Sequence, residues 1–590
     1  MAPPTSPRLA AYLVAGTAFV TPLVAASAAL AADDSATPAE GAAPSTAPAG
    51  ETVGGEATGG AATAGTNEAD LRHQLEIHSP FFDAETGNFA WKVVPAVDVM
   101  GTFTDNILQT HSDRRWDVGI AVTPSVAVIG NTPNTQLRLF YAPTVQLYAR
   151  TPQENSLTQS LNGYASFTVV PDTFYVYASA YAGVGSTTGF GANGLGYGTP
   201  GFTPNPAGIG AIGVTRQTAQ QSYSFSIIPT AMHRFGDAGT LTASYTASAT
   251  LAETFPGSFL PSFGSGGTSQ HSYSQQEQLQ FVSGEAFGRW SDVALLYTNQ
   301  TYGSGQLSGA TQSNATNQLG YAFNQFVTVS GLLGYQEQTY PAAQGAASVS
   351  YSGIAYQAST TLTPNPDSQI TLGYGRTYNV TGPYVNAWYA LTARTTISAN
   401  YSASQTTNLQ STQNQVALGQ INQYGNFVNR QTGAPLVLGA NNGLGIRPGV
   451  YKTKTLGAGS TTTYDRDWIS VTLTGQSQQA VSVPTAENFD FAGPIPTVGS
   501  TDTFWTVATY WRHSYSPDLS GTVGLYYSNA SYPGRSPSRE NSVGTTFSWQ
   551  YAFSPNLTGY FVYNFYSTNY SLSAQNIYVD TVVIGLHRSF

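Results

Sequence analysis

From about residue 88 to the end of the chain, apolar and polar side chains alternate along many short segments. In one such segment Leu137, Leu139 and Leu147 alternate with Arg138 and Gln146. Successive side chains of a β-strand point to opposite faces of the sheet. Each segment therefore predicts a strand with one apolar face and one face of neutral polar, tyrosyl or occasional arginine side chains. In a transmembrane β-barrel the apolar face meets lipid and the polar face lines the lumen.

The connections between these segments alternate in length. Short turns rich in Pro, Asp, Asn and Gly recur at 131–134, 171–172, 236–239, 365–368, 465–467, 516–518 and 554–556. Longer polar loops lie between them at 186–218, 255–272, 408–449 and 479–500. Short periplasmic turns and longer external loops are typical of bacterial outer-membrane barrels. The pattern predicts an all-β fold, a single large antiparallel up-and-down barrel of about 22 strands (roughly 18 to 26), with both termini in the periplasm.

The start of the chain predicts export. Arg8 precedes an apolar stretch over 9–32 that ends in a small-residue cleavage pattern, so we expect a signal peptide at 1–31. An uncleaved anchor is the alternative. Residues 32–87 are rich in Ala, Gly and Pro and predict a disordered periplasmic tether, with one short amphipathic helix at 67–77 as an option. The barrel is expected to occupy 88–590.

Composition narrows the classes of protein further. Only 9% of residues are charged, and aromatic residues make up 12%. The chain has no cysteine, which excludes a disulfide framework, a thiolate metal site, a catalytic thiol and a lipidated N-terminal cysteine. Only three lysines occur and no basic run follows, so nucleic acid is not an expected partner. No window after the signal segment approaches the ~20 apolar residues of a membrane helix. An exported chain then either is soluble or spans a membrane as a closed barrel.

The last strand carries the expected assembly signal. Val582, Ile584, Leu586 and the final Phe590 share one face. A terminal aromatic residue resembles the signal that the barrel assembly machinery reads, although Arg588 departs from the usual apolar residue. We therefore expect the assembly machinery, outer-membrane lipids and lipopolysaccharide as partners.

The first strands resemble a known family. The segments 91–95 (WKVVP), 101–107 (GTFTDNI), 123–125 (TPS) and 141–143 (YAP) follow in a recognisable order. This part of the chain resembles outer-membrane β-barrel porin families of proteobacteria, some of whose members are found with exopolysaccharide systems. The resemblance is at the level of motifs over roughly 89–150 and only in general character over the rest of the chain. It implies a barrel pore and carries no functional residues to transfer.

Charged and polar residues in the first expected external loop have either a structural role or a binding role. Asp105 and Asn106 are expected to cap the loop through side-chain to backbone bonds, with a ligand role as the alternative. Asp113, Arg114 and Arg115 either bind lipopolysaccharide phosphates or are simply solvated charges.

Catalytic, cofactor and metal signals are weak. The seven histidines are scattered without ligand spacing. His233 and His513 lie near expected periplasmic turns beside Arg234 and Arg512, which favours an interfacial girdle over a catalytic pair. The glycine-rich segment 191–196 lacks a following helix or lysine and indicates a flexible loop. We expect no enzyme, no cofactor and no metal.

The function that follows is a porin-like channel that passes small hydrophilic solutes or exports a polysaccharide. The alternative is a barrel that acts as an adhesin, receptor or structural anchor through its external loops. Wide barrels are usually plugged, yet no plug domain precedes this one. The inward-folding loop 408–449 is the best candidate for closure, and the tether entering from below is another. The expected lumen-lining residues are Arg138, Gln146, Arg150, Tyr175, Tyr177 and Tyr181.

Overall fold

The computed structural model describes residues 90–186, 219–254, 269–366, 368–417, 419–421, 427–429, 446–485, 496–533, 538–571 and 576–590. The expected signal peptide, the tether with its optional helix at 67–77, the glycine-rich segment 191–196 and most of the expected loops 186–218 and 255–272 lie outside these residues. None of the helices in the described part of the chain is long and apolar enough to cross a membrane.

The described residues form one 22-stranded sheet, a two-stranded hairpin and one α-helix. The first strands are β1 (Trp91–Thr104), β2 (Asp117–Thr132), β3 (Thr135–Tyr148), β4 (Ser156–Val170), β5 (Phe174–Ser186), β6 (Ala219–Arg234), β7 (Gly239–Thr254), β8 (Ser269–Ser283), β9 (Trp290–Gly303), β10 (Ala310–Asn324), β11 (Val327–Tyr340) and β12 (Val349–Asn365). They are followed by β13 (Ser368–Thr377), β14 (Val380–Thr392), β15 (Thr395–Thr407), α4 (Asn408–Ala417), β16 (Gly419–Ile421) and β17 (Phe427–Asn429). The last strands are β18 (Val450–Thr463), β19 (Asp467–Ser482), β20 (Thr501–Ser514), β21 (Leu519–Ser531), β22 (Arg539–Ser554), β23 (Leu557–Tyr570) and β24 (Ile577–Ser589).

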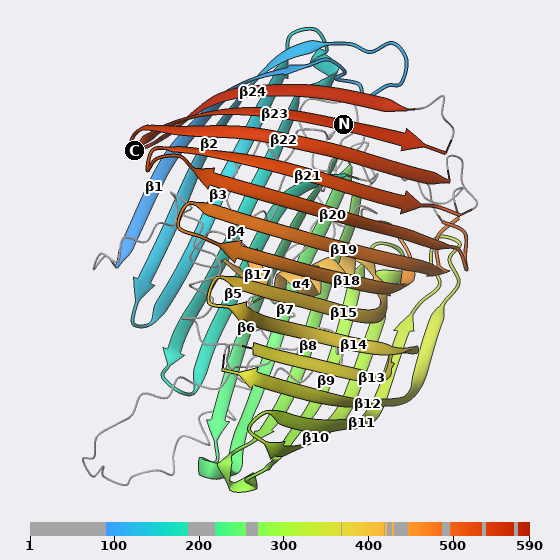
Figure 1. Ribbon diagram of the computed structural model, residues 1–590. Coiled ribbons are helices and arrows are strands. Elements are labelled where there is room, and N and C mark those ends of the chain that lie inside the picture. The colour runs from blue at the N-terminus through green and yellow to red at the C-terminus, as the bar shows by residue number, and fades with distance from the viewer. Residues whose placement is uncertain are drawn as a thin grey trace, which may run out of the picture. The chain divides into compact units, whose positions relative to one another are not determined.

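The large sheet is a closed antiparallel barrel (Figure 1). Each strand pairs with the next along the chain, β15 pairs with β18, and β24 returns to pair with β1. The strand count predicted from the turn signals is confirmed. Two predicted loops are too long, because β8 begins at Ser269 and β19 continues to Ser482. The first residues of β8 are polar on both faces, and a polarity pattern cannot separate them from loop.

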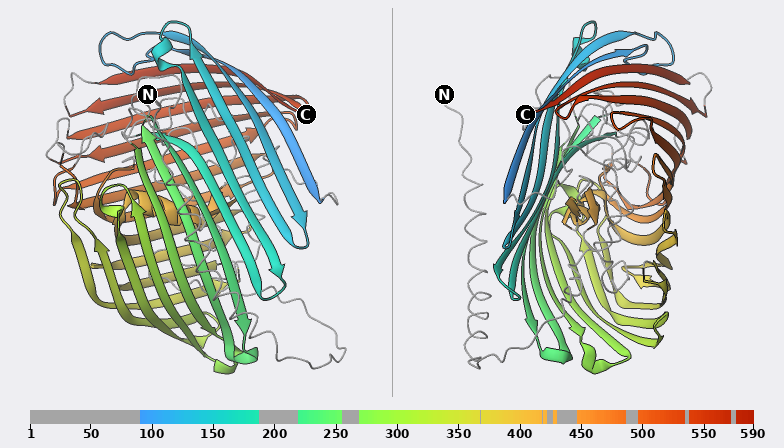
Figure 2. Two further views of the ribbon diagram at one scale, coloured as in Figure 1. Left: turned by 180° about the vertical axis from the view of Figure 1, so that it is seen from behind. Right: turned by 60° about the vertical axis from the view of Figure 1, so that its left-hand side comes forward.

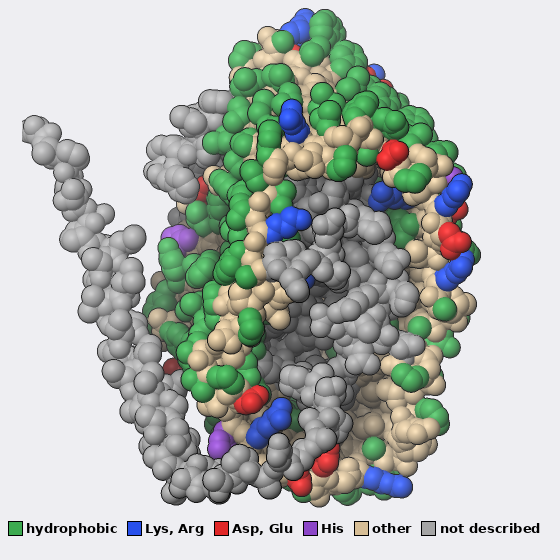
Figure 3. All heavy atoms as spheres, turned by 90° about the vertical axis from the view of Figure 1, so that its left-hand side faces the viewer, with side chains coloured by type: hydrophobic (Ala, Val, Ile, Leu, Met, Phe, Trp, Pro, Cys, Tyr) green, Lys and Arg blue, Asp and Glu red, His purple; other side chains and the backbone are tan. Residues whose placement is uncertain are grey.

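The outer wall of the barrel is an apolar band. Leu296, Leu333 and Ile584 leave 55%, 65% and 63% of their surface exposed. Hydrophobic side chains gather over the outer wall in Figure 3. Exposed aromatic side chains lie at both edges of the band. On the side of the short turns they include Trp91, Phe235, Trp290, Phe326 and Tyr515, and on the opposite side Phe103, Trp116, Tyr273, Tyr302 and Trp505.

The seam between β1 and β24 is reinforced on the inside of the barrel. The register pairs Ala96–Thr104 of β1 with Thr581–Ser589 of β24. Asp98 and His587 are direct register partners, and the His587 Nδ1 atom lies 3.0 Å from Asp98 Oδ1. Both side chains are largely buried. A hydrogen bond between side chains therefore adds to the main-chain ladder at the point where the two ends of the sheet meet.

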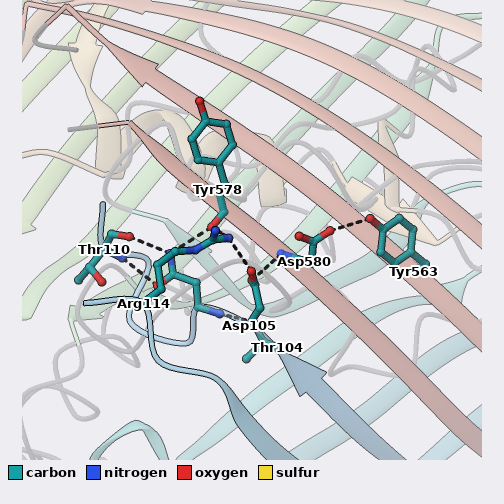
Figure 4. A network of polar contacts seen from close by, with 8 residues as sticks. Thr104, Asp105, Thr110, Arg114, Tyr563, Tyr578 and Asp580 are labelled. Carbon is teal, nitrogen blue, oxygen red and sulfur yellow. Dashed lines mark hydrogen bonds and ion pairs between the residues drawn. The ribbon is translucent and has the colours of Figure 1, made fainter. Parts of the chain in front are cut away.

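A second set of bonds reinforces the same seam at its external end (Figure 4). Asp105 Oδ1 accepts a hydrogen bond of 2.8 Å from the Asp580 main-chain N–H. Asp105 Oδ2 forms an ion pair of 2.5 Å with Arg114, and Arg114 also donates to the Tyr578 carbonyl at 3.0 Å. Tyr563 donates its hydroxyl to Asp580 Oδ1 at 2.6 Å. The first external loop is thereby attached to the last strand.

Asn106 caps this loop from within. Its Oδ1 atom accepts the Thr110 N–H at 3.1 Å, and its Nδ2 atom donates to the Thr110 and Tyr578 carbonyls. The predicted capping role of Asp105 and Asn106 is confirmed by these bonds to main-chain atoms. Arg115 pairs with Asp113 at 2.9 Å, and both of these side chains are exposed.

The seam network predicts a measurable loss of barrel stability. In the variant Arg114→Ala, β24 loses a hydrogen bond and Asp105 loses its partner. Because the pair is partly exposed, we expect a cost of only about 1 kcal/mol. The folded barrel should unfold at a lower temperature in a gel-shift assay. The variant Arg115→Ala, whose pair is more exposed and does not touch β24, is the control. Equal shifts in the two variants would show that the network does not hold the seam.

Candidate functional site

The inner faces of β8, β10 and β11 are built from neutral polar side chains. On β8 the burial alternates strictly along Gln270–Gln280, and the buried positions are Gln270, Ser272, Ser274, Gln276, Gln278 and Gln280. These residues face inward, because Ser272 contacts α4 inside the barrel. The inward faces of β10 and β11 continue the pattern with buried amides at Gln312, Asn314, Gln336 and Gln338. Amides and hydroxyls accept and donate hydrogen bonds without carrying charge.

The connection between β15 and β18 begins with α4, which lies inside the barrel (Figure 2). The Thr407 Oγ1 atom accepts the Gln410 N–H at 3.1 Å and caps the helix. Leu409 is fully buried among apolar residues of the wall that include Ala310 and Tyr340. At the other end of the helix Ala417 packs against Ile228. The prediction that this loop folds inward is confirmed for its described residues.

The helix joins opposite sides of the ring. At its first residue, Asn408 Oδ1 accepts a hydrogen bond of 2.9 Å from Gln478 of β19. Near its end, the Val416 carbonyl accepts one of 2.7 Å from Ser179 of β5. About half of the strands separate β5 from β19 in either direction around the ring. The two ends of the ten-residue helix α4 therefore contact strands from opposite parts of the ring.

Gln410 is the polar centre of this crossing. Its Oε1 atom accepts hydrogen bonds from the Tyr340 hydroxyl at 2.7 Å and from the Thr406 hydroxyl at 3.1 Å. Its Nε2 atom donates to Gln312 Oε1 at 3.2 Å. Another contact to the wall comes from Ser272, which donates to Gln413 Oε1 at 3.3 Å. The helix is therefore bonded to β8, β10 and β11 as well as to the strands at its ends.

The returning end of the loop is fastened to the wall by main-chain and side-chain bonds. The Gln220 amide of β6 accepts the Ile446 N–H at 3.0 Å and donates to the Ile446 carbonyl at 3.2 Å. Gln270 donates to the same carbonyl at 3.3 Å. Gly449 has a φ of +113°, and a Cβ atom there would lie 2.6 Å from the Ser482 carbonyl oxygen. Glycine is needed where the loop leaves the lumen to enter β18.

A buried ion pair locks the same end. Arg447 Nη1 lies 2.5 Å from Asp502 Oδ2 at the external end of β20, and the two side chains are only 4% and 2% exposed. The guanidinium carbon also lies 5.8 Å from the centre of the Tyr532 ring. Breaking a buried pair by removing one partner is strongly unfavourable, because an uncompensated charge remains. This pair, Arg447 with Asp502, is called the latch below.

The expected lumen-lining residues take different places. Arg138 lies on the inward face of β3, and on the same face the Gln146 amide donates to the Tyr148 hydroxyl at 2.6 Å. Arg150 lies beyond the end of β3, where its guanidinium covers the Trp116 ring at 4.1 Å. Alternation continued past the end of a strand assigned Arg150 to the lumen, whereas it lies at the external rim.

The three expected tyrosines lie on the inward face of β5, the face from which Ser179 contacts α4. The rings of Tyr175 and Tyr177 stack with their centroids 6.4 Å apart. Tyr177 also packs against Ile228 and Ala417, so it contacts the end of the helix. Tyr181 is nearly fully buried.

The two histidines near the short turns belong to the aromatic edge of the outer wall. His513 Nδ1 lies 2.8 Å from Asp467 Oδ1, which also accepts the Trp511 indole N–H at 2.8 Å. His233 packs edge-on against Phe235 with centroids 4.6 Å apart. These contacts fit the expected interfacial girdle. Among the described residues no group of three or more His, Asp or Glu side chains is placed to hold a metal ion.

No family model matches the sequence, and no curated protein matches it. Solved structures do match. The FrpB iron transporter of Neisseria meningitidis (F5-1 variant) is 11% identical with a TM-score of 0.44, over 91% of this chain and 87% of that one. The siderophore receptor PiuA of Acinetobacter baumannii is 11% identical with a TM-score of 0.43, over 84% and 82%. OpdK of Pseudomonas aeruginosa with vanillate is 7% identical with a TM-score of 0.31, over 85% and 99%. The resemblance to porin families stays a prediction.

Proposed function

We propose that this protein is an outer-membrane channel for small hydrophilic solutes or an exported polysaccharide, and that the loop 408–449 gates it. The observation that carries the proposal is a closed barrel with a mostly neutral polar lumen. The helix α4 lies across this lumen, and the latch holds the returning end of the same loop. The apolar outer band with aromatic residues at both edges supports a position in the outer membrane, since it matches the hydrocarbon layer and its two interfaces.

The lining supports a cargo rich in hydroxyl groups. Amides and hydroxyls can replace the hydrogen bonds that a sugar loses when it leaves water. Some hydrogen-bonding groups of the lining have no partner within the described part of the chain. Both polar atoms of the Asn314 amide and the Thr246 Oγ1 atom are buried there without a hydrogen-bond partner. A neutral wall has little counter-charge for an ionic cargo, so the neutral class fits better.

The contacts of the loop support a gate that can open. Each hydrogen bond to the wall contributes about 1 kcal/mol net, and about 1.4 kcal/mol changes the ratio of open to closed barrels tenfold. Several such bonds and the latch hold the loop closed most of the time. The barrel itself does not depend on them, because Thr407 and Val450 on either side of the loop are already paired in the sheet.

Removing the loop should therefore leave an open and intact barrel. Because Thr407 faces Val450, a two-residue Asn-Gly turn can replace residues 408–449 as a hairpin connection. In planar bilayers we expect the full-length protein to be silent and the shortened protein to show large, steady conductance. Large conductance in both would contradict gating by this loop. Silence in both would favour the adhesin, receptor or anchor alternative.

Breaking the latch should open the channel part of the time. Arg447→Ala leaves the Asp502 carboxylate buried without its ion-pair partner, at a cost of about 3–5 kcal/mol to the closed state. We expect the open fraction in single-channel recordings to rise at least tenfold. The exchange Arg447→Asp with Asp502→Arg should restore closure. Arg394→Ala is the control, because its pair with Asp465 is exposed. An unchanged open fraction in Arg447→Ala would remove the latch from the mechanism.

The cargo class is tested on the shortened protein in liposomes. Neutral oligosaccharides should enter faster than uronic acid oligosaccharides of equal length, since the lining has few charges to compensate a carboxylate. Swelling rates in the two sugars give the comparison. Faster entry of the acidic sugar would contradict the neutral class and leave the channel itself in place.

A further inference from the structure

The apolar band of the outer wall is interrupted on β8, β9 and β10, and the polar surface reaches β11 at the exposed Glu337, the register partner of Ser313. On β8 the exposed, outward-facing residues include Gln275 and Glu277. Their register partners on β9 are Gln300 and Thr298, which are exposed as well. The polar surface continues onto β10, where Ser313 is the register partner of Thr298. We call Gln275, Glu277, Thr298, Gln300 and Ser313 the outer polar patch.

The patch lies within the height of the band. Along the outward face of β8, Glu277 is four residues from Tyr273 on one side and four from Phe281 on the other. Tyr273 belongs to the aromatic edge on the external side and pairs with Tyr302. The next outward pair toward the turns is Leu279 with Leu296, which are 40% and 55% exposed. On β8 and β9, apolar and aromatic side chains therefore flank the patch above and below.

Contact with lipid is unfavourable for the outer polar patch. The Glu277 carboxyl and the Gln275 and Gln300 amides form no hydrogen bond or ion pair with the described residues. Hydrocarbon offers no partner either, and polar groups left unpaired there are costly. The cost disappears if a second protein surface with matching donors and acceptors covers the patch.

We propose that the patch is the contact face of a symmetric dimer of this chain. Two copies in one membrane share the same orientation, so a two-fold axis parallel to the membrane normal keeps every residue at its own depth. A copy therefore presents polar groups at the depth where they are needed, and the face complements itself as a two-fold contact requires. With the axis near the central strand β9, Glu277 of β8 meets hydroxyl groups on β9 and β10 of the second copy.

Cysteine crosslinking tests this contact in the full-length protein, because the chain has no cysteine of its own. Thr298→Cys places a thiol on β9 at the expected axis. Leu525→Cys, which is 56% exposed on β21, is the matched control on a distant part of the wall. A short bis-maleimide should link two copies of the Thr298→Cys protein in outer membranes, at least tenfold more than in the control. Equal yields in the two variants would overturn the proposal.

The mass of the protein in lipid nanodiscs is the second measurement. We expect two chains for the wild type and one for the double variant Gln275→Leu with Glu277→Leu, which should keep its heat-resistant barrel. A single chain in the wild type would overturn the proposal, as would a dimer that the double variant leaves intact. Dimers of the wild type with monomers of the folded variant would establish the patch as the contact.

Discussion

The pairing of main-chain groups is the constraint on which this structure depends. A strand surrounded by lipid has no water to bond its N–H and C=O groups, so an open edge is not tolerated. The return of β24 to β1 removes both edges at once. The ends of the sheet meet only at this seam, and two groups of side-chain bonds reinforce it there. Asp98 with His587 lies on the inner face, and Asp105 with Arg114 lies at the external rim.

Closure of the barrel also explains why the loops are not needed to hold the sheet together. Because the ladder is complete without them, a loop that folds inward costs the sheet nothing. A ring of 22 strands is too wide for wall side chains alone to fill. The described residues of the loop after β15 occupy part of that space through many weak hydrogen bonds and one buried ion pair, Arg447 with Asp502. Such a set of contacts can hold the loop against the wall and still allow it to detach.

The sequence predicts the strands and turns well and the loop contacts poorly, for physical reasons. Alternation and turn residues are local, so they reveal the strand number and the positions of the turns. Alternation does not show where a strand stops, which misplaced Arg150. The helix α4 has a local signal in Thr407 and Gln410, at the spacing of a capping box. That signal was missed because the helix lies within a polar loop. Its contacts with Gln312 and Gln478 join residues far apart in sequence, and no local pattern encodes them.

The wall formed by β8, β9 and β10 carries polar side chains on both faces at mid-height. A lipid-facing wall needs only one polar face, so the second requires its own explanation. On the inner face Gln270, Ser272 and Gln312 contact the loop that crosses the lumen. On the outer face, Gln275 and Glu277 lie on the same strand as the first two of these residues. Neighbouring side chains of one strand move with one backbone, so whatever covers the outer face also fixes the inner surface to which the loop is bonded. In the proposed dimer and gate, assembly and closure would then depend on the same three strands.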